Sequence, residues 1–232
     1  MNHSLQPYQS GRADGAAFVG QRNRVLRNTY WLLALSMVPT VLGAWIGVST
    51  GLASALSPGI SLVVFLAGAF GFMFAIEKTK NSAAGVPMLL AFTFFMGLML
   101  SRLVGTVLGS ANGASLVMTA FAGTGAIFLG MAALSTVIKR DLSAMGKWLF
   151  VGAIMLLVAG IANFFIQSGA LMMTLSVAAI GIFSAFILHD LKRVQDGLET
   201  NYISATLGVY LSIYNVFQSL LALLGIAGGR DE

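Results

Sequence analysis

Three ionisable side chains lie inside or at the ends of long apolar runs, and they are the first candidates for chemistry. Asp190 follows His189 near the end of one run, Arg102 lies within another, and Glu77 ends a third. Because an ionised group is costly in hydrocarbon, each such residue is a functional candidate by default. A carboxylate buried at position 190 could change its protonation with pH and act as a proton-sensitive latch.

Each of these side chains also has a plain structural alternative. Asp190 can cap its helix at the membrane boundary, with its charge balanced by Lys192 and Arg193. Arg102 can extend outward until its guanidinium reaches the headgroups, or it can pair inward with a carboxylate or with carbonyls. Glu77 can be solvated at the boundary. The residue types alone leave these alternatives open.

A polar stripe marks the last apolar run. Its small and polar members, spaced four, three and four residues apart, are Gly208, Ser212, Asn215 and Ser219. A second polar edge is made by Tyr210, Tyr214 and Gln218. In lipid such a stripe must face protein or water, because unmet polar groups are costly there. We therefore predict that the last helix is central, with Asn163 as a partner for the stripe. Hydrogen bonding for packing would use the same residues.

The elements that carry these residues are membrane spans. Of the 232 residues, 57% are hydrophobic and only 9% are charged, whereas a soluble domain has about 25% charged residues. A helix crosses the hydrocarbon with about 20 mostly apolar residues. Seven stretches qualify, and they predict an all-α bundle of seven transmembrane helices: Thr29–Leu52, Gly59–Ile76, Val86–Gly109, Ala114–Ile138, Lys147–Gln167, Ala170–Asp190 and Ile203–Ile226.

The basic residues predict the orientation of the bundle. With the N-terminus inside the cell, the cytoplasmic segments hold all of the 13 Lys and Arg residues except Arg102 and Arg230. This asymmetry is what the positive-inside rule expects of a chain with its N-terminus inside and its C-terminus outside. The sequence thus divides into a cytoplasmic, disordered tail (1–28), a membrane domain (29–226) and a short external tail (227–232).

Several activities are excluded for want of residues. The chain has no cysteine, which removes disulfides and thiolate chemistry. It has no metalloprotease, phosphate-loop or dinucleotide motif, so we predict no enzyme activity, no cofactor and no metal site. The net charge of +5 does not indicate nucleic-acid binding, because the basic residues sit singly or in pairs beside apolar segments.

Small residues and one proline predict details of helix packing. Gly43 and Gly47, and likewise Gly105 and Gly109, are spaced so that a neighbouring backbone can approach closely. Pro39 removes a backbone donor inside the first span and predicts a kink there.

Three segments carry a resemblance to a known family. They are Val-Leu-Arg-Asn-Thr-Tyr at 25–30, Gly-Leu-Glu-Thr-Asn-Tyr-Ile-Ser-Ala-Thr at 197–206, and Val-Tyr-Leu-Ser-Ile-Tyr-Asn-Val-Phe-Gln-Ser-Leu-Leu at 209–221. The chain resembles the Bax inhibitor-1 family, and within it the bacterial YccA branch. The resemblance implies a bundle in which the last helix is surrounded by the other six.

Two functions come with the resemblance. Family members act as pH-sensitive calcium leaks gated by two aspartates, and Asp190 in Leu-His-Asp-Leu matches the first. At the second position Tyr210-Leu-Ser places Ser212, which does not ionise, so the shared-proton pair cannot form. A calcium or proton leak, with Asp190 as sensor and Ser212, Asn215, Arg102 and Glu77 as pathway candidates, is the alternative hypothesis.

The YccA branch implies the preferred hypothesis. It is associated with the membrane protease FtsH, as a substrate and modulator. The tail from Met1 to Gln21 is a suitable handle for such a protease, since an unfolded segment can be threaded while the helices resist extraction; an inert terminus is the alternative. We therefore expect a bacterial inner-membrane protein whose partners are the lipid bilayer and an FtsH-type protease.

Overall fold

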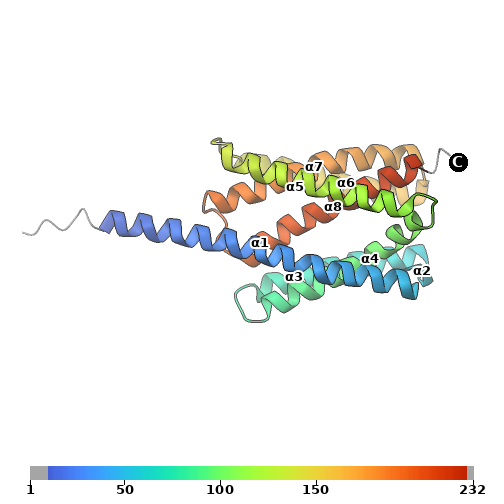
Figure 1. Ribbon diagram of the computed structural model, residues 1–232, viewed down its shortest axis with the longest axis horizontal. Helices are drawn as coiled ribbons and strands as arrows, with labels where there is room; N and C mark the ends of the chain where they lie inside the picture. Colours follow the sequence, from blue (N-terminus) through green and yellow to red (C-terminus); the bar gives the residue numbers. More distant parts are fainter. Residues whose placement is uncertain (1–9, 229–232) are drawn as a thin grey trace, which may run out of the picture.

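The computed structural model describes the backbone of residues 10–228, and the side chains of 19–52 and 55–228. Within that range every regular element is helical (Figure 1). The elements are α1 (Ser10–Thr50), α2 (Leu52–Ala55), α3 (Pro58–Thr79), α4 (Gly85–Leu108), α5 (Gly113–Val137), α6 (Ser143–Ile166), α7 (Gly169–Gln195) and α8 (Tyr202–Gly228). All except α2 are long and apolar enough to cross a membrane. The prediction of an all-α, seven-span membrane protein is confirmed.

The last helix lies at the centre of the bundle, as predicted. α8 packs against α1, α4, α5 and α7, while α3 and α6 pack mainly on the outer sides of α4 and α7. Four helices rather than all six thus form the main surroundings of α8. The largest fully buried side chains come mostly from α4, α7 and α8, among them Phe92, Ile187 and Tyr210.

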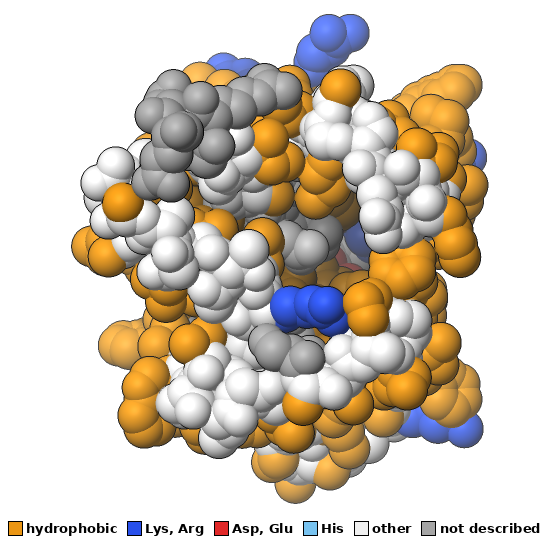
Figure 2. All heavy atoms as spheres, turned by 90° about the vertical axis from the view of Figure 1, so that its right-hand side faces the viewer, with side chains coloured by type: hydrophobic (Ala, Val, Ile, Leu, Met, Phe, Trp, Pro, Cys, Tyr) orange, Lys and Arg blue, Asp and Glu red, His pale blue; other side chains and the backbone are white. Residues whose placement is uncertain are grey.

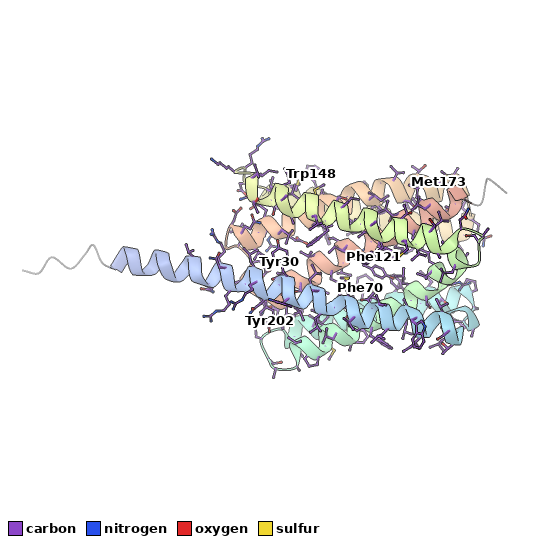
Figure 3. The ribbon with its side chains drawn as sticks, in the orientation of Figure 1. Tyr30, Phe70, Phe121, Trp148, Met173 and Tyr202 are labelled. Carbon is purple, nitrogen blue, oxygen red and sulfur yellow. The ribbon has the colours of Figure 1, made fainter. Side chains whose placement is uncertain are left out.

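Large apolar side chains also cover the outside of the bundle. Phe70, Phe121 and Trp148 project from α3, α5 and α6, and each is more than half exposed (Figure 3). An exposed apolar surface this extensive fits contact with lipid tails rather than water. The exposed apolar side chains therefore fit the prediction that the lipid bilayer surrounds the bundle.

The first helix is longer than predicted. α1 begins at Ser10 and spans 41 residues, which is about 60 Å at 1.5 Å per residue, and its N-terminal part projects beyond the bundle (Figure 1). Residues 10–28 therefore continue the first span as helix instead of forming a disordered tail. The extension is held because Val25 packs with Val194 and Ala205. Residues 1–9, the start of the expected protease handle, lie outside the described residues, as do 229–232.

The break between the fifth and sixth predicted spans is a tight turn, as expected. Gln167 takes a left-handed conformation (φ 56°) and Ser168 caps α7 by accepting the N–H of Leu171 at 3.2 Å. Asn163 belongs to this turn, because its side-chain oxygen accepts the N–H of Ser168 at 3.1 Å. Among the described residues the Asn163 side chain makes no hydrogen bond to the stripe of α8, so the predicted pairing is not found and Asn163 serves the turn instead.

Of the two predicted glycine pairs, only the first makes a close interface. A Cβ at Gly43 would overlap the carbonyl oxygen of Phe94 in α4, and one at Gly47 would overlap the Ser101 side chain. A Cβ at Gly105 would instead meet only ordinary contacts. The partner that α4 contributes is Gly97, where a Cβ would overlap the backbone of α1 at Thr40.

The two ends of the bundle differ in charge. The loops 80–84, 138–142 and 196–201 lie together with residues 22–27 of α1 at one end, which we call the basic end because it carries the lysines and most arginines. The opposite end carries the loops 51–57, 109–112 and 167–168, none of which contains a charged residue. Which side of a membrane each end faces stays a prediction.

Candidate functional site

Asp190 lies at the basic end, where α7 meets α8. Its side-chain oxygen is 3.0 Å from Nδ1 of His189, and the two side chains are only 18% and 8% exposed. A Cβ built on Gly208 of α8 would come within 2.8 Å of the other carboxylate oxygen. The absence of a side chain at position 208 is therefore what lets the carboxylate lie against α8. Among the described residues His189 is its one hydrogen-bond partner.

The imidazole of His189 also packs against a glycine, which leaves the space that the ring occupies. A Cβ on Gly146, in the first turn of α6, would come within 2.6 Å of Nε2 of His189. Phe186 packs edge-on against the ring, with 6.5 Å between centroids. Three helices thus meet at the His189–Asp190 pair: α6 through Gly146, α7 through the pair itself and α8 through Gly208. The sequence analysis did not predict that Gly146 and Gly208 make room for this pair, although it noted Gly208 as a member of the stripe.

Further polar contacts lie at the basic end. Lys192 is largely buried and pairs with Asp196, and Gln195 donates from Nε2 to Ser135 Oγ at 2.7 Å. Asp141, in the loop before α6, accepts the N–H of Ser143 at 2.8 Å. Hydrogen bonds from Ser143 hold the pKa of the Asp141 carboxyl below its usual value, with a smaller contribution from Lys192. The loops at this end are consequently tied to α5, α6 and α7.

The stripe of α8 bonds mostly to its own helix. Ser212 Oγ donates to the carbonyl of Gly208 at 3.0 Å, and Asn215 donates to the carbonyl of Leu211 at 2.8 Å. Within the described part of the chain neither side chain hydrogen bonds to Asp190. The structure thus places Ser212 one turn beyond Gly208, without a hydrogen bond to Asp190.

The tyrosines of the second polar edge connect α8 to its neighbours. The Tyr210 hydroxyl lies 2.9 Å from Thr40 Oγ1 of α1 and donates to the carbonyl of Thr93 in α4 at 3.4 Å. The Tyr214 hydroxyl donates to the carbonyl of Met96 at 3.3 Å. The polar character of the central helix therefore serves interhelical packing at these two positions, as one of the alternatives predicted.

Arg102 and Glu77 lie away from Asp190 and from each other. Arg102 lies near the opposite end, donates to Ser61 Oγ at 3.4 Å and lines a cavity of about 490 Å³. Glu77 is exposed at the basic end, where it pairs with Lys80. The three ionisable candidates thus do not converge on one site. In the residues that the structure describes, no group of three or more His, Asp or Glu side chains could hold a metal ion.

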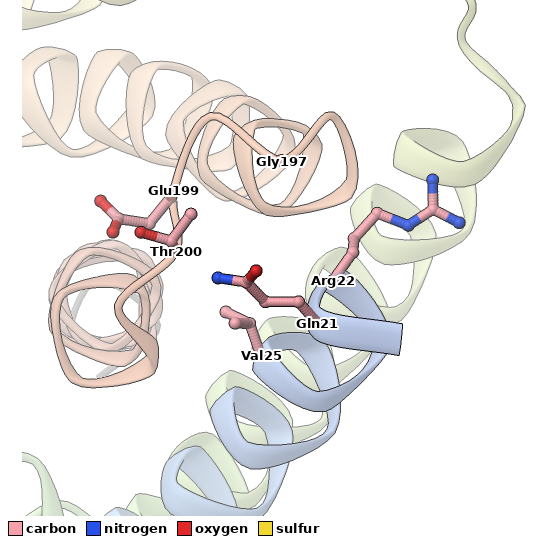
Figure 4. Close-up of a pocket in the computed structure, with 6 residues that line it drawn as sticks. All are labelled: Gln21, Arg22, Val25, Gly197, Glu199 and Thr200. Carbon is pink, nitrogen blue, oxygen red and sulfur yellow. The ribbon is translucent and has the colours of Figure 1, made fainter. Parts of the chain in front are cut away.

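A narrow crevice lies where the projecting part of α1 meets the loop before α8 (Figure 4). It is lined by Gln21, Arg22, Val25, Gly197, Glu199 and Thr200. Its volume of about 30 Å³ has room for little more than a water molecule. Arg22 donates to the carbonyl of Gln195 at 3.3 Å, so the crevice marks a joint between α1 and the 196–201 loop.

Comparison with known proteins gives consistent matches over nearly the whole chain. The sequence profile of the family described as "Inhibitor of apoptosis-promoting Bax1" matches residues 22–229. A Neisseria meningitidis protein is 38% identical over 94% of this chain and 97% of its own length, and a Vibrio cholerae membrane protein is 37% identical over 91% and 93%. An Escherichia coli protein named "Modulator of FtsH protease YccA" is 36% identical over 90% and 92%. A second E. coli relative is named an inner membrane protein.

Proposed function

This chain belongs to the Bax inhibitor-1 family, and we propose that it is a multi-pass membrane protein that binds and modulates an FtsH-type protease without catalysis of its own. The observation that carries the proposal is the match, over most of both chains, to the E. coli protein named as a modulator of FtsH. The named activity belongs to that relative, and its extension to this chain is the proposal.

The proposal includes an orientation in the bacterial inner membrane. We place the basic end in the cytoplasm, since Lys and Arg concentrate there and the loops of the opposite end carry no charge. The N-terminus is then cytoplasmic and the C-terminus periplasmic. The projecting part of α1 emerges on the cytoplasmic side.

The surface proposed to meet the protease is the projecting part of α1 together with the 196–201 loop. Arg22 and Val25 attach this part of α1 to the bundle, through the carbonyl of Gln195 and through Val194 and Ala205. A protease that pulls the chain from Met1 would reach the start of α1 at Ser10. It would then reach the point at Arg22 where α1 packs against the bundle. Such a joint would resist further extraction, so the chain would occupy the protease rather than pass through it quickly.

Co-purification tests this proposal. The intact chain, carrying an affinity tag at its C-terminus, is expected to recover the FtsH-type protease of its host from mild detergent, and a variant lacking residues 2–20 is expected to recover much less. A matched control replaces the exposed Lys147 with Gln at the start of α6, away from α1, and should leave recovery unchanged. Failure of the intact chain to recover any protease would contradict the proposal.

A calcium or proton leak is not part of the proposal. The second carboxylate of the family pattern is replaced by Ser212, whose hydroxyl bonds to Gly208. The cavity at the opposite end is lined by a cation, Arg102, and by no carboxylate among the described residues. Both features weigh against a path for calcium.

A further inference from the structure

The cavity beside Arg102 has no role in the proposed function. It lies between α3 and α4 on one side and α6, α7 and α8 on the other. Its volume of about 490 Å³ falls within the range of sites that hold small molecules. Figure 2 looks at the opposite end of the bundle and shows a hollow near its centre, with a basic side chain beside it.

The lining of the cavity is sharply divided in polarity. Arg102 is its one charged side chain, and Ser61, Tyr214 and Gln218 are its other polar members. The remaining lining is apolar, including Leu62, Phe65, Met99, Leu100, Phe164 and Met172. A single cation beside a deep apolar surface is the pattern expected for a ligand with one anionic end and a hydrocarbon tail.

Arg102 has hydrogen-bonding capacity to spare. A guanidinium carries five N–H donors, and within the described part of the chain Arg102 makes one side-chain hydrogen bond, to Ser61 Oγ at 3.4 Å. It is also the one charged side chain that the described residues place near this end. A cation in this position favours an anion, and its planar fork fits a carboxylate with two parallel hydrogen bonds.

The depth of Arg102 suits a ligand drawn from the bilayer. The residue lies six positions before the end of α4 at Leu108, about 9 Å along the helix at 1.5 Å per residue. That depth is near the boundary between headgroups and hydrocarbon. The apolar lining continues deeper, to Phe65 in α3 and to the level of Tyr214 in the middle of α8.

From these observations we propose that the cavity binds a long-chain carboxylate, such as a fatty acid, taken from the surrounding membrane. The carboxylate is held by Arg102 and Ser61, and the hydrocarbon tail lies between α3 and α4 on one side and α6 and α7 on the other. The binding is non-covalent. It is independent of the protease interaction at the basic end, so either proposal can fail without the other.

Photolabelling tests the proposal directly. The full chain is reconstituted in phosphatidylcholine vesicles with a palmitic acid analogue that carries a diazirine in its chain, and labelled peptides are identified by mass spectrometry. We expect labels concentrated on cavity residues of α3, α4, α6 and α7. Arg102→Gln should reduce this labelling about tenfold, because a charge-assisted hydrogen bond is lost. The corresponding diazirine alcohol should label the cavity weakly.

Control variants separate binding from misfolding. Arg24→Gln removes an exposed arginine at the basic end and should leave labelling unchanged. Ser61→Trp keeps Arg102 but fills the space beside it, and should also reduce labelling while the melting temperature shows that the chain is folded. Equal labelling by acid and alcohol, or labels spread evenly over the lipid-facing surface, would overturn the proposal. So would acid labelling that occurs only after Asp231 and Glu232 are replaced by Asn and Gln, because the chain's own terminus would then be the occupant.

Discussion

The carboxylate of Asp190 in α7 lies directly against the backbone of Gly208 in α8, so close that a Cβ at position 208 would come within 2.8 Å of a carboxylate oxygen. The same carboxylate contacts Nδ1 of His189 at 3.0 Å, and that imidazole rests on Gly146 of α6. Two glycines therefore allow a partly buried acid and its buried histidine partner to fit between three helices. The fit makes position 208 sensitive to even the smallest side chain.

Replacing Gly208 with Ala tests this fit. The added methyl group must displace the Asp190 carboxylate and disturb its contact with His189, and we expect a loss of about 1–3 kcal/mol in the free energy of unfolding. A lower melting temperature of the purified variant in detergent would report this loss. The double variant with Asp190→Ala should recover most of it, since the methyl group then has space.

A matched glycine in the adjacent helix provides the control. Gly181 in α7 has no atom within 4 Å of a built Cβ, so Gly181→Ala should leave the melting temperature unchanged or raise it slightly through higher helix propensity. If both alanine variants behave alike, the contact between Asp190 and Gly208 does not limit the packing of α7 on α8.

The loop before α6 should give the basic end a modest pH dependence. Ser143 donates to the Asp141 carboxylate and lowers its pKa below the usual 3.8. Because the folded pKa is lower than the unfolded one, the ionised carboxylate stabilises the fold above about pH 4, and this contribution is lost as the pH falls through the folded pKa. Asp141→Asn should therefore lower the melting temperature slightly at pH 7 and by less at pH 3. A difference that is as large at pH 3 as at pH 7 would contradict this account.

Asn201 connects the start of α8 to the loop after α3. Its side-chain oxygen accepts the N–H groups of Ile203 at 2.9 Å and Ser204 at 3.1 Å, and its side-chain nitrogen donates to the carbonyl of Lys80 at 3.1 Å. Asn201→Ala removes both functions, and loss of the cap alone costs about 0.5–2 kcal/mol. We expect a lower melting temperature and faster cleavage of the 80–84 loop by added protease.

The conservative variant Asn201→Asp separates the two functions. It keeps an oxygen that can cap α8 but cannot donate to Lys80. The melting temperature should lie between those of the wild type and Asn201→Ala, while cleavage in the 80–84 loop should be as fast as in the alanine variant. Slow cleavage in the aspartate variant would show that the loop is held by other contacts.

The spans were predictable because lipid imposes a length and a composition on any helix that crosses it. The predicted span Gly59–Ile76 corresponds to α3 at Pro58–Thr79, and the turn predicted at 167–169 lies at 167–168, with Gly169 as the first residue of α7. The extension of α1 to Ser10 was missed, because a polar segment outside the membrane has no apolar period to mark it as helix. Its contacts with Val194 and Ala205 come from the far end of the chain.

The polar sites were harder to predict, because their partners depend on competition between local and distant bonds. Asn163 was expected to reach α8 but caps the turn at Ser168, which is nearer in the chain. Asp190 and Arg102 were singled out because burying a charge is costly. Nothing in their own segments indicated that Asp190 would pack against Gly208 or that Arg102 would line a cavity beside Ser61. Contacts between helices that are far apart in sequence can be identified only once the packing of the bundle is known.

The interface of α1 and α4 gives the sharpest contrast between two glycines in one helix. A Cβ at Gly97 would overlap the Thr40 carbonyl oxygen, whereas the nearest atom to a Cβ at Gly105 is a methyl carbon of Val48 at 3.8 Å. Backbone cannot yield as a flexible side chain does, so Gly97→Ala must push the helices apart. We expect a cost of about 3 kcal/mol or more and a strongly lowered melting temperature, while Gly105→Ala should be tolerated. Equal tolerance of both would mean that α1 and α4 do not pack as closely in the membrane as described.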